Sequence, residues 1–324
     1  MKKCFLAMLL AFNVCLLASG AFADVPVVLR LGMTTEVGGH YYRGAEKFKE
    51  NLEKYTNGKV TVELFPSSQL GNERDMIEGA AMGLIDMCIV SSAPLANFSP
   101  DFMVFDFPFI VVDRQKAYSI MDGEVGTAIL KALEDKGIKG LGFWENGFRH
   151  VSNNKKVIAH PGDLAGVKIR TMENPIHQAT FKLLGATPTP MAWGEVFIAL
   201  QQGTIDGQEN PLIIFSTVKI YEVQKHLSLT GHFYSPAPFL MSKQVFDSFD
   251  KDIQDAILRA EKEARDWERE YSASLDEQIR KELEAKGVTI TDVDREEWKK
   301  ACLPVYEQFR SKVNPEYLKA MLGE

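Results

Sequence analysis

Residues 27–90 of the chain read VVLRLGMTTEVGGHYYRGAEKFKENLEKYTNGKVTVELFPSSQLGNERDMIEGAAMGLIDMCIV. Apolar runs of strand length alternate here with amphipathic runs of helix length. The pattern predicts strands over Val27–Met33, Lys59–Phe65 and Ile85–Val90, with helices over Tyr41–Tyr55 and Asn72–Met82 between them. Alternation of this kind is typical of an α/β sandwich.

The alternation continues downstream. Asp113–Lys136 has a helical pattern with a break near Gly123, and Asp252–Lys286 has the apolar spacing of one long amphipathic helix. That helix would be about 50 Å long, enough to lie across two lobes, although two helices with a bend near Ser272–Ser274 would give the same pattern. Further strands are expected over Ile138–Phe143, Val167–Arg170 and Ile205–Glu209, and further helices over Asn174–Leu184 and Trp193–Gln202, separated by the prolines of Thr187–Pro190.

A weak internal repeat at a spacing of 120 residues supports two lobes of similar construction. Asp75–Asp86 and Glu195–Asp206 align without gaps, and in both a helix ends at a glycine before Ile-Asp leads into a strand. The helix–glycine–strand unit is common in α/β folds, so chance similarity is the alternative.

The chain has 324 residues, of which 45% are hydrophobic, 10% aromatic and 25% charged, a globular composition rather than a disordered, collagenous or disulfide-scaffold one. At roughly 100–200 residues per domain, this length allows one large or two medium domains. The 37 Lys and Arg against 44 Asp and Glu give a net charge of −7, and no basic run occurs, which argues against a nucleic-acid partner.

The first residues have the features of a secretory signal peptide. Lys2 and Lys3 precede an apolar segment over Phe5–Leu17, and an Ala-Phe-Ala ending predicts cleavage after Ala23. A membrane anchor is the alternative, but the apolar run is short for a span. Cys15 lacks the preceding small residues of a lipoprotein site. We therefore expect a soluble, exported mature chain.

The mature chain carries none of the usual catalytic signatures. It lacks a Gly-x-Ser-x-Gly elbow, a His-Glu-x-x-His pair, a phosphate loop, a Cys-x-x-Cys pair and a dinucleotide glycine motif, and its histidines lack metal-ligand spacing. Its two cysteines, Cys88 and Cys302, could pair in an oxidising compartment or stay free. The sequence therefore predicts no catalytic residue, no metal and no cofactor.

Polar side chains stand instead at the ends of apolar strands, where open α/β sheets bind ligands. Arg170 ends one such strand, Glu209 and Asn210 end the next, and Arg149 follows the strand that starts at Ile138. The planar fork of an arginine offers two parallel donors to a carboxylate. The alternatives are an ordinary ion pair for Arg170 and a helix cap for Asn210.

Trp193 stands at the start of a predicted helix. As a site residue it would cover a ligand with its ring face. The alternative is an ordinary core position.

Three segments, Lys168–Pro175 (KIRTMENP), Gly185–Val196 (GATPTPMAWGEV) and Gln202–Pro211 (QGTIDGQENP), strongly resemble the DctP-type solute-binding proteins of TRAP transporters. Pro66–Arg74 and Tyr221–Lys225 extend the resemblance to nearly the whole mature chain. It implies a two-lobed periplasmic binding protein fold of the α/β class, with a ligand cleft between the lobes and a long lobe-spanning C-terminal helix. The expected lobes are 24–147 with about 236–275, and 148–235 with about 276–324, after a signal peptide over 1–23.

The resemblance also implies a function and site residues. It implies a periplasmic receptor that captures an organic acid and delivers it to a TRAP permease with one small and one large membrane subunit. We expect the receptor itself to be a monomer. Arg170 matches the arginine that forms the family's salt bridge to the ligand carboxylate, and Asn210, next to Glu209, matches the asparagine that also contacts it. Arg149 matches a second arginine often used in the site. Trp193 lies where sialic-acid receptors of the family carry a phenylalanine over the ligand.

The far end of the ligand is expected to contact the first lobe, where the family varies. The candidates there are Glu36, His40, Tyr41, Glu73 and Ser91, with Glu145 and Asn146 near the hinge. Sialic-acid receptors carry a glutamate at the position of Ser91, which disfavours sialic acid. A C4-dicarboxylate and a sugar acid such as a uronate both remain open.

Two other classes of function are compatible with the same fold. A secreted enzyme acting on an organic acid would need an acid–base pair that the motifs lack. A sensor subunit that presents the bound acid to a signalling partner would need the same cleft and the same closure as a transport receptor. The sequence argues against the enzyme and does not distinguish the sensor.

Overall fold

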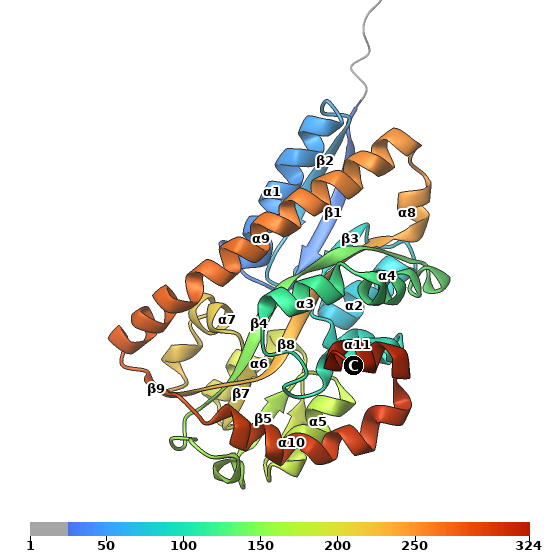
Figure 1. The fold of residues 1–324 in the computed structure, drawn as a ribbon. Coiled ribbons are helices and arrows are strands. Elements are labelled where there is room, and N and C mark those ends of the chain that lie inside the picture. Colours follow the sequence, from blue (N-terminus) through green and yellow to red (C-terminus); the bar gives the residue numbers. More distant parts are fainter. Residues whose placement is uncertain (1–24) are drawn as a thin grey trace, which may run out of the picture.

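The computed structural model describes residues 25–324, so the predicted signal peptide lies outside the described residues. Within them, one nine-stranded sheet has the strand order β2-β1-β3-β8-β4-β7-β5-β6, with β9 beside β8 (Figure 1). The strands are β1 (Val27–Met33), β2 (Val60–Phe65), β3 (Met87–Ile89), β4 (Ile138–Asn153), β5 (Lys168–Thr171), β6 (Thr187–Pro190), β7 (Gly207–Asn210), β8 (His226–Ser242) and β9 (Thr289–Thr291).

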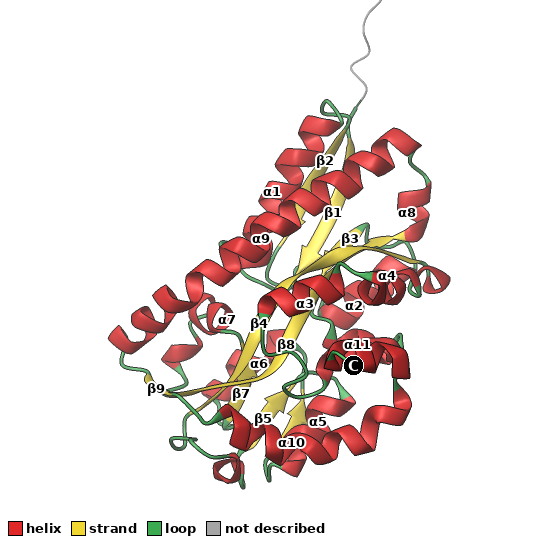
Figure 2. Cartoon of the chain, in the orientation of Figure 1, coloured by secondary structure: helices red, strands yellow, loops and turns green. Residues whose placement is uncertain are grey.

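Helices surround this sheet (Figure 2). The α-helices are α1 (His40–Tyr55), α2 (Glu73–Ala81), α3 (Arg114–Met121), α4 (Glu124–Lys131), α5 (Pro175–Leu183), α6 (Trp193–Gln201), α7 (Leu212–Thr217), α8 (Lys243–Asp247), α9 (Lys251–Ala285), α10 (Arg295–Phe309) and α11 (Pro315–Leu322). The 3₁₀ helices are η1 (Ala93–Asn97), η2 (Pro100–Asp106), η3 (Glu134–Lys136), η4 (Pro161–Leu164), η5 (Ile220–Glu222) and η6 (Arg310–Lys312).

The sheet consists of two similar halves joined by two long strands. In the first half β1 pairs in parallel with β2 and β3, and in the second half β5 pairs in parallel with β6 and β7. β3 joins β8 and β7 joins β4, both antiparallel, while β4 and β8 pair with each other along both halves. The β4–β8 register shifts between Glu145 and Gly147, where the chain passes from one half to the other. The predicted two-lobed α/β fold is confirmed.

The 120-residue repeat corresponds to equivalent elements of the two halves. α2 and α6 are each followed by a glycine with positive φ, 73° at Gly83 and 70° at Gly203, a conformation that favours glycine. After each turn an aspartate accepts a backbone N–H from the central strand of its half, Asp86 from β1 at 2.8 Å and Asp206 from β5 at 3.0 Å. The repeat is therefore structural and not a chance similarity.

α9 is one continuous helix of 35 residues, so the alternative with a bend near Ser272–Ser274 is wrong. It starts at Asp250, whose side chain accepts the Ile253 N–H at 2.9 Å. At 1.5 Å per residue it is about 52 Å long. It packs on α1 and β4 in the first half and on α7 and β9 in the second, and Figure 1 shows it running alongside α1. The predicted lobe-spanning helix is confirmed.

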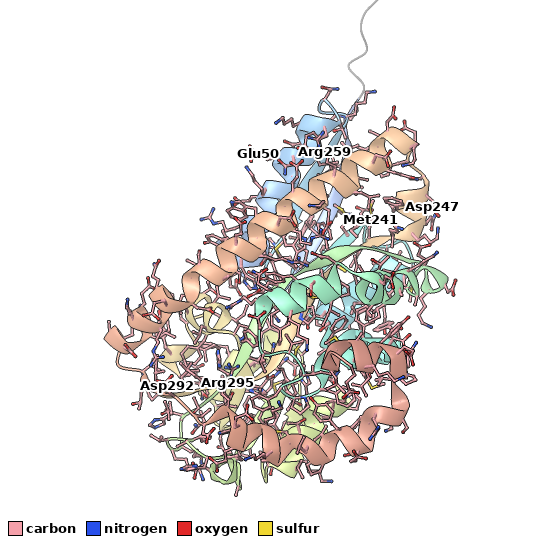
Figure 3. All side chains as sticks on the ribbon, viewed as in Figure 1. Glu50, Met241, Asp247, Arg259, Asp292 and Arg295 are labelled. Carbon is pink, nitrogen blue, oxygen red and sulfur yellow. The ribbon has the colours of Figure 1, made fainter. Side chains whose placement is uncertain are left out.

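The two faces of α9 differ in polarity. Ala256, Ala260 and Ala264 are buried in the same apolar cluster as Phe48 of α1. The opposite face carries exposed ion pairs at a spacing of four residues, such as Arg259–Glu263 at 3.1 Å, with Arg259 labelled in Figure 3. The small inner side chains let the two helices approach closely, while the charged face remains in water.

The end of the chain returns to the first half. Phe309 of α10 and Leu318 and Met321 of α11 are buried in the same apolar cluster as Phe102 of η2. The apolar face of α11 is buried because it covers η2. The predicted division, which assigned all of 276–324 to the second lobe, stays a prediction.

The two cysteines of the described chain are free. Cys88 lies on β3 and Cys302 on α10, in separate apolar clusters. Burial raises the pKa of both thiols, to about 12 for Cys302. Both thiols therefore stay protonated at neutral pH and are poor nucleophiles.

Glu261 is a buried carboxyl on α9 whose ionisation should make stability depend on pH. Its Oε1 accepts a hydrogen bond from Trp144 Nε1 at 3.1 Å, and Arg265 Nη1 lies 3.7 Å from Oε2. Burial raises its pKa to about 7, and the Arg265 charge offsets only part of this. Between the ordinary pKa of 4.5 and about 7 the folded protein holds a proton that the unfolded chain has released. The free energy of unfolding therefore falls as the pH rises through this window.

Glu261→Gln keeps an acceptor for Trp144 but cannot ionise. We expect the variant to be more stable than the wild type at pH 8, by about 1–3 kcal/mol, and close to it at pH 5. Urea unfolding at both pH values measures the difference. Glu277→Gln, at an exposed position of the same helix, is the control. An unchanged pH dependence in Glu261→Gln would contradict the assignment.

Candidate ligand-binding site

A small cavity lies between the two halves of the molecule. The space inside it, part of which is open solvent, is about 320 Å³. The ends of β1, β3, β5 and β7 and the first turns of α1, α2, α6 and α7 meet there. The lining residues are Thr34, Thr35, Tyr41, Glu73 and Ser91 from the first half, Asn146 from β4, and Arg170, Met172, Trp193, Asn210 and Ile214 from the second half. The cavity thus lies outside the carboxyl ends of the parallel strands, as in other open α/β sheets.

Arg170, on β5, lines this cavity as a buried cation. It is 2% exposed, and its Nε and Nη2 donate to the Met191 carbonyl oxygen at 2.9 and 2.8 Å. No carboxylate of residues 25–324 forms an ion pair with it. Burial lowers its pKa to about 10, against the attraction of Glu209, so the guanidinium stays charged at neutral pH. A buried cation without a counter-ion is unfavourable, and its remaining donors suit a carboxylate.

Trp193 and Asn210 lie on the same wall as Arg170. Trp193 is the first residue of α6, and its ring centroid lies 5.7 Å from the guanidinium carbon of Arg170, within cation–π range. Asn210 ends β7 and donates from Nδ2 to Gln208 Oε1 at 2.6 Å. It does not cap α7, whose N-cap residue is Pro211. The helix-cap alternative for Asn210 is therefore wrong.

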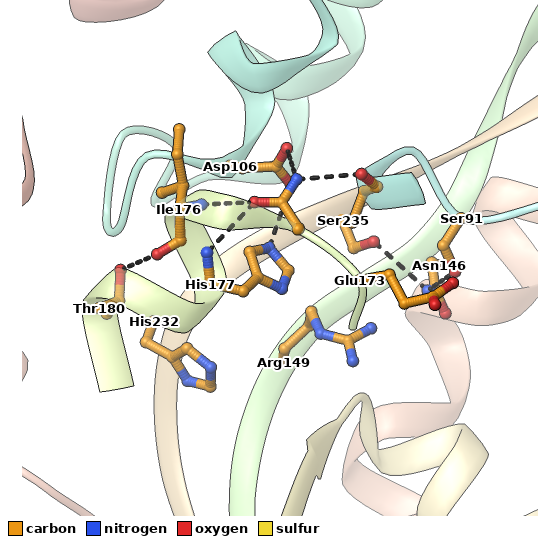
Figure 4. A network of polar contacts seen from close by, with 12 residues as sticks. Ser91, Asp106, Asn146, Arg149, Glu173, Ile176, His177, Thr180, His232 and Ser235 are labelled. Atoms are coloured by element: carbon orange, nitrogen blue, oxygen red, sulfur yellow. Dashed lines mark hydrogen bonds and ion pairs between the residues drawn. The ribbon is translucent and has the colours of Figure 1, made fainter. Parts of the chain in front are cut away.

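The opposite wall is polar and mostly neutral. Glu73, the first residue of α2, accepts the Ser91 N–H on Oε1 at 2.6 Å, and burial raises its pKa. Asn146 donates from Nδ2 to Ser91 Oγ at 3.1 Å and to Ser235 Oγ at 3.3 Å (Figure 4). Three buried atoms on this wall have no hydrogen-bond partner within the described chain: Thr35 Oγ1, Tyr41 OH and Asn146 Oδ1. Buried polar atoms are rarely left unpaired. These three atoms can therefore take a ligand as their hydrogen-bond partner.

Arg149 and Glu209, both predicted to contact the ligand, pair with each other instead. Arg149 Nε lies 2.5 Å from Glu209 Oε2, its Nη2 lies 2.8 Å from Oε1, and both side chains are fully buried. His232 Nε2 adds a contact to the same carboxylate at 3.3 Å. Burial opposes ionisation of Glu209, but the Arg149 charge holds the pKa of that carboxyl well below its ordinary value. Neither residue is among those that line the cavity, and each neutralises the other's charge.

Three other candidates also lie away from the cavity wall. His40 is buried beside the Tyr41 ring, and burial lowers its pKa to about 3, so it is neutral. Glu36 is half-buried and accepts a hydrogen bond from the Ser67 hydroxyl. Glu145 is buried in an ion pair with Arg114 at 2.7 Å. The prediction that these residues contact a ligand finds no support in this geometry.

Four further residues line the cavity without having been predicted from the sequence: Thr34, Thr35, Met172 and Ile214. Thr34 and Thr35 follow directly after β1, and Met172 follows β5. The strand-end rule that selected Arg170 could have found these three. Ile214 inside α7 has no such signal. Among the described residues, no group of three or more His, Cys, Asp or Glu side chains is arranged to hold a metal ion.

Comparison with known proteins identifies similar chains. The family model for bacterial extracellular solute-binding proteins of family 7, DctP, matches residues 31–312. The chain is 42% identical over 293 residues to a solute-binding protein of Verminephrobacter eiseniae. The match covers 89% of this chain and 87% of the relative. It is 39% identical over 292 residues to the 2,3-diketo-L-gulonate-binding periplasmic protein YiaO of Escherichia coli, with coverage of 90% and 87%.

Solved structures agree with these sequence matches. A TRAP periplasmic solute-binding protein from Polaromonas sp. JS666, bound to D-erythronate, has a TM-score of 0.89 and 40% identity over 91% of this chain and 98% of the other. Related solved structures hold succinate, galactonate or β-D-galacturonate. All of these ligands are organic acids.

Proposed function

Because the chain belongs to the DctP family of extracellular solute-binding proteins of TRAP transporters, we propose that it captures an organic acid in the cavity between its halves, with Arg170 holding the carboxylate. Several relatives of known structure hold organic acids, and the family is one of solute-binding proteins and not of enzymes. One observation carries the assignment of Arg170: its guanidinium is buried on the cavity wall and forms no ion pair within the described chain. A ligand carboxylate would supply the missing counter-ion.

The neighbours of Arg170 support the same orientation of the ligand. The Trp193 ring and the Asn210 amide lie on the Arg170 wall, so they would flank the bound carboxylate. The rest of the ligand would then meet the wall formed by Tyr41, Ser91 and their neighbours. Binding to both walls favours the closed arrangement of the lobes, because only that arrangement offers both sets of contacts.

The relatives and the N-terminal sequence support a periplasmic location. YiaO and the Polaromonas protein are periplasmic. We expect residues 1–23 to direct export and to be removed after Ala23. The mature monomer would then deliver its ligand to the small and large membrane subunits of a TRAP permease. From residue 25 onward, no helix has both the length and the apolarity to cross a membrane.

A thermal-shift screen of the refolded mature protein tests this proposal. The protein is first unfolded and refolded, because unfolding releases any acid that was purified with it. The panel contains C4-dicarboxylates, uronates, aldonates, 2-oxo acids, sialic acid and aromatic acids, with uncharged analogues such as erythritol beside D-erythronate. An acid at 100 times its dissociation constant adds about 2.7 kcal/mol to the free energy of unfolding, so a bound acid raises Tm. A rise with an acid but not with its uncharged analogue supports the proposal, and no rise with any acid contradicts it.

A further inference from the structure

The cavity has one charge on each wall. Among the described residues that line it, Arg170 is the only cation and Glu73 is the only carboxyl. Arg170 belongs to β5 of the second half and Glu73 to α2 of the first. Their charges act on each other across the cavity, but no direct ion pair joins them. A ligand placed between them therefore has its carboxylate at one end and faces a carboxyl at the other.

Glu73 is fixed in position by the first turn of α2. Asn72 Oδ1 accepts the Asp75 N–H at 3.0 Å, and Asp75 Oδ2 accepts the Asn72 N–H at 2.9 Å, which closes the helix start. The helix N-terminus favours a negative charge at this place. Oε1 of Glu73 accepts the Ser91 N–H, while Oε2 makes no hydrogen bond within residues 25–324. One carboxylate oxygen is thus left to accept a hydrogen bond from the ligand.

The groups around Glu73 are neutral. The unpaired atoms Thr35 Oγ1, Tyr41 OH and Asn146 Oδ1 can form hydrogen bonds with hydroxyl groups. No second cation is among the described residues that line this cavity. Arg74, next to Glu73, pairs with Glu78 at 2.9 Å, and the charge of Arg149 is neutralised by Glu209. A second ligand carboxylate would lie against Glu73 without a counter-ion, which is unfavourable in a buried site.

We infer that the site selects short hydroxylated monocarboxylates over dicarboxylates, and that Glu73 sets this selectivity by accepting a hydrogen bond from a ligand hydroxyl remote from Arg170. The inference rests on the proposed function, because it takes the carboxylate to be held by Arg170. The small size of the cavity favours a short acid.

Three four-carbon acids separate the contributions to affinity of the Arg170 end and the Glu73 end of the cavity. D-Erythronate carries hydroxyl groups, butyrate carries none, and succinate carries a second carboxylate. Isothermal titration calorimetry of the refolded wild type measures the three affinities at pH 8, because burial raises the pKa of Glu73 and a higher pH favours its ionised form. We expect D-erythronate to bind at least about tenfold more tightly than succinate or butyrate, which is the range of one hydrogen bond to a charged group.

The Glu73→Gln variant tests the role of this residue. It should bind D-erythronate about 10–100-fold more weakly, bind succinate no more weakly than the wild type, and leave butyrate unchanged. If Glu73 had only a structural role, its replacement would weaken the binding of all three acids alike. Glu78→Gln is the matched control, since Glu78 lies on the same helix but forms an exposed ion pair with Arg74 at 2.9 Å. The control should preserve the wild-type ratios.

The outcomes distinguish this inference from the proposed function. Succinate binding as tightly as D-erythronate to the wild type overturns the inference but leaves the Arg170 site intact. Equal weakening of all three acids in Glu73→Gln also overturns it, as does failure of D-erythronate to bind. Failure of every acid in the thermal-shift panel overturns the proposed function itself.

Discussion

Replacing Arg170 with alanine is expected to weaken acid binding by about 2–5 kcal/mol while leaving the protein folded. The loss is large because the ligand carboxylate would be desolvated in the cavity without its partner. Folding should not suffer, since Arg170 is itself a buried charge without a counter-ion and its removal relieves that cost. Titration calorimetry with the best acid from the screen measures the affinity, and thermal unfolding of the free protein measures the stability.

Arg170→Lys separates the charge from the shape of the side chain. Lysine keeps the positive charge, but a point charge does not reproduce the two parallel donors of the guanidinium. We therefore expect this variant also to lose much of the affinity. Full affinity in Arg170→Ala would refute the assigned role, and full affinity in Arg170→Lys would limit that role to charge alone.

Replacing Glu209 with alanine is expected to lower the free energy of unfolding by about 3–5 kcal/mol. The substitution leaves the Arg149 guanidinium fully buried without a counter-ion, because Glu209 supplies two short contacts to it at 2.5 and 2.8 Å. Urea unfolding of the ligand-free protein measures the change, so that lost ligand binding does not enter the comparison.

A double variant provides the control for the Glu209 prediction. Arg149→Met with Glu209→Leu removes both charges and keeps similar side-chain volumes. Buried ion pairs replaced in this way often retain or gain stability, so the double variant should be more stable than Glu209→Ala. A Glu209→Ala protein as stable as the wild type would show that the buried pair does not have the assigned structural role.

The first half of the fold could be predicted closely from the sequence. Its strands place apolar residues such as Leu29, Leu31, Val60 and Val62 at buried positions, and its helices have clear amphipathic spacing. β8 (His226–Ser242) was missed and β4 continues ten residues beyond the predicted end at Phe143. Both strands contain glycines, prolines or buried polar residues, and they are stabilised by pairing with each other rather than by an apolar pattern. The separator Thr187–Pro190 is the edge strand β6, where prolines are tolerated.

The site residues that stand at strand ends or helix starts could be predicted from the sequence. Arg170, Asn210 and Trp193 stand where strands end or helices begin, and the structure brings all three to the cavity. Arg149 and Glu209 looked equivalent to them in the sequence. Their mutual pairing depends on the antiparallel register of β4 and β7, which sets His150 opposite Asn210 and cannot be read from either strand alone.

A crystal structure of the protein with the acid that gives the largest thermal shift tests the role of Arg170 most directly. We expect the ligand carboxylate to lie between the two halves, with its oxygens about 2.7–2.9 Å from guanidinium nitrogens of Arg170. Trp193 and Asn210 should flank that carboxylate. A carboxylate bound elsewhere in the molecule, with Arg170 still without an anionic partner, would show that Arg170 does not hold the ligand.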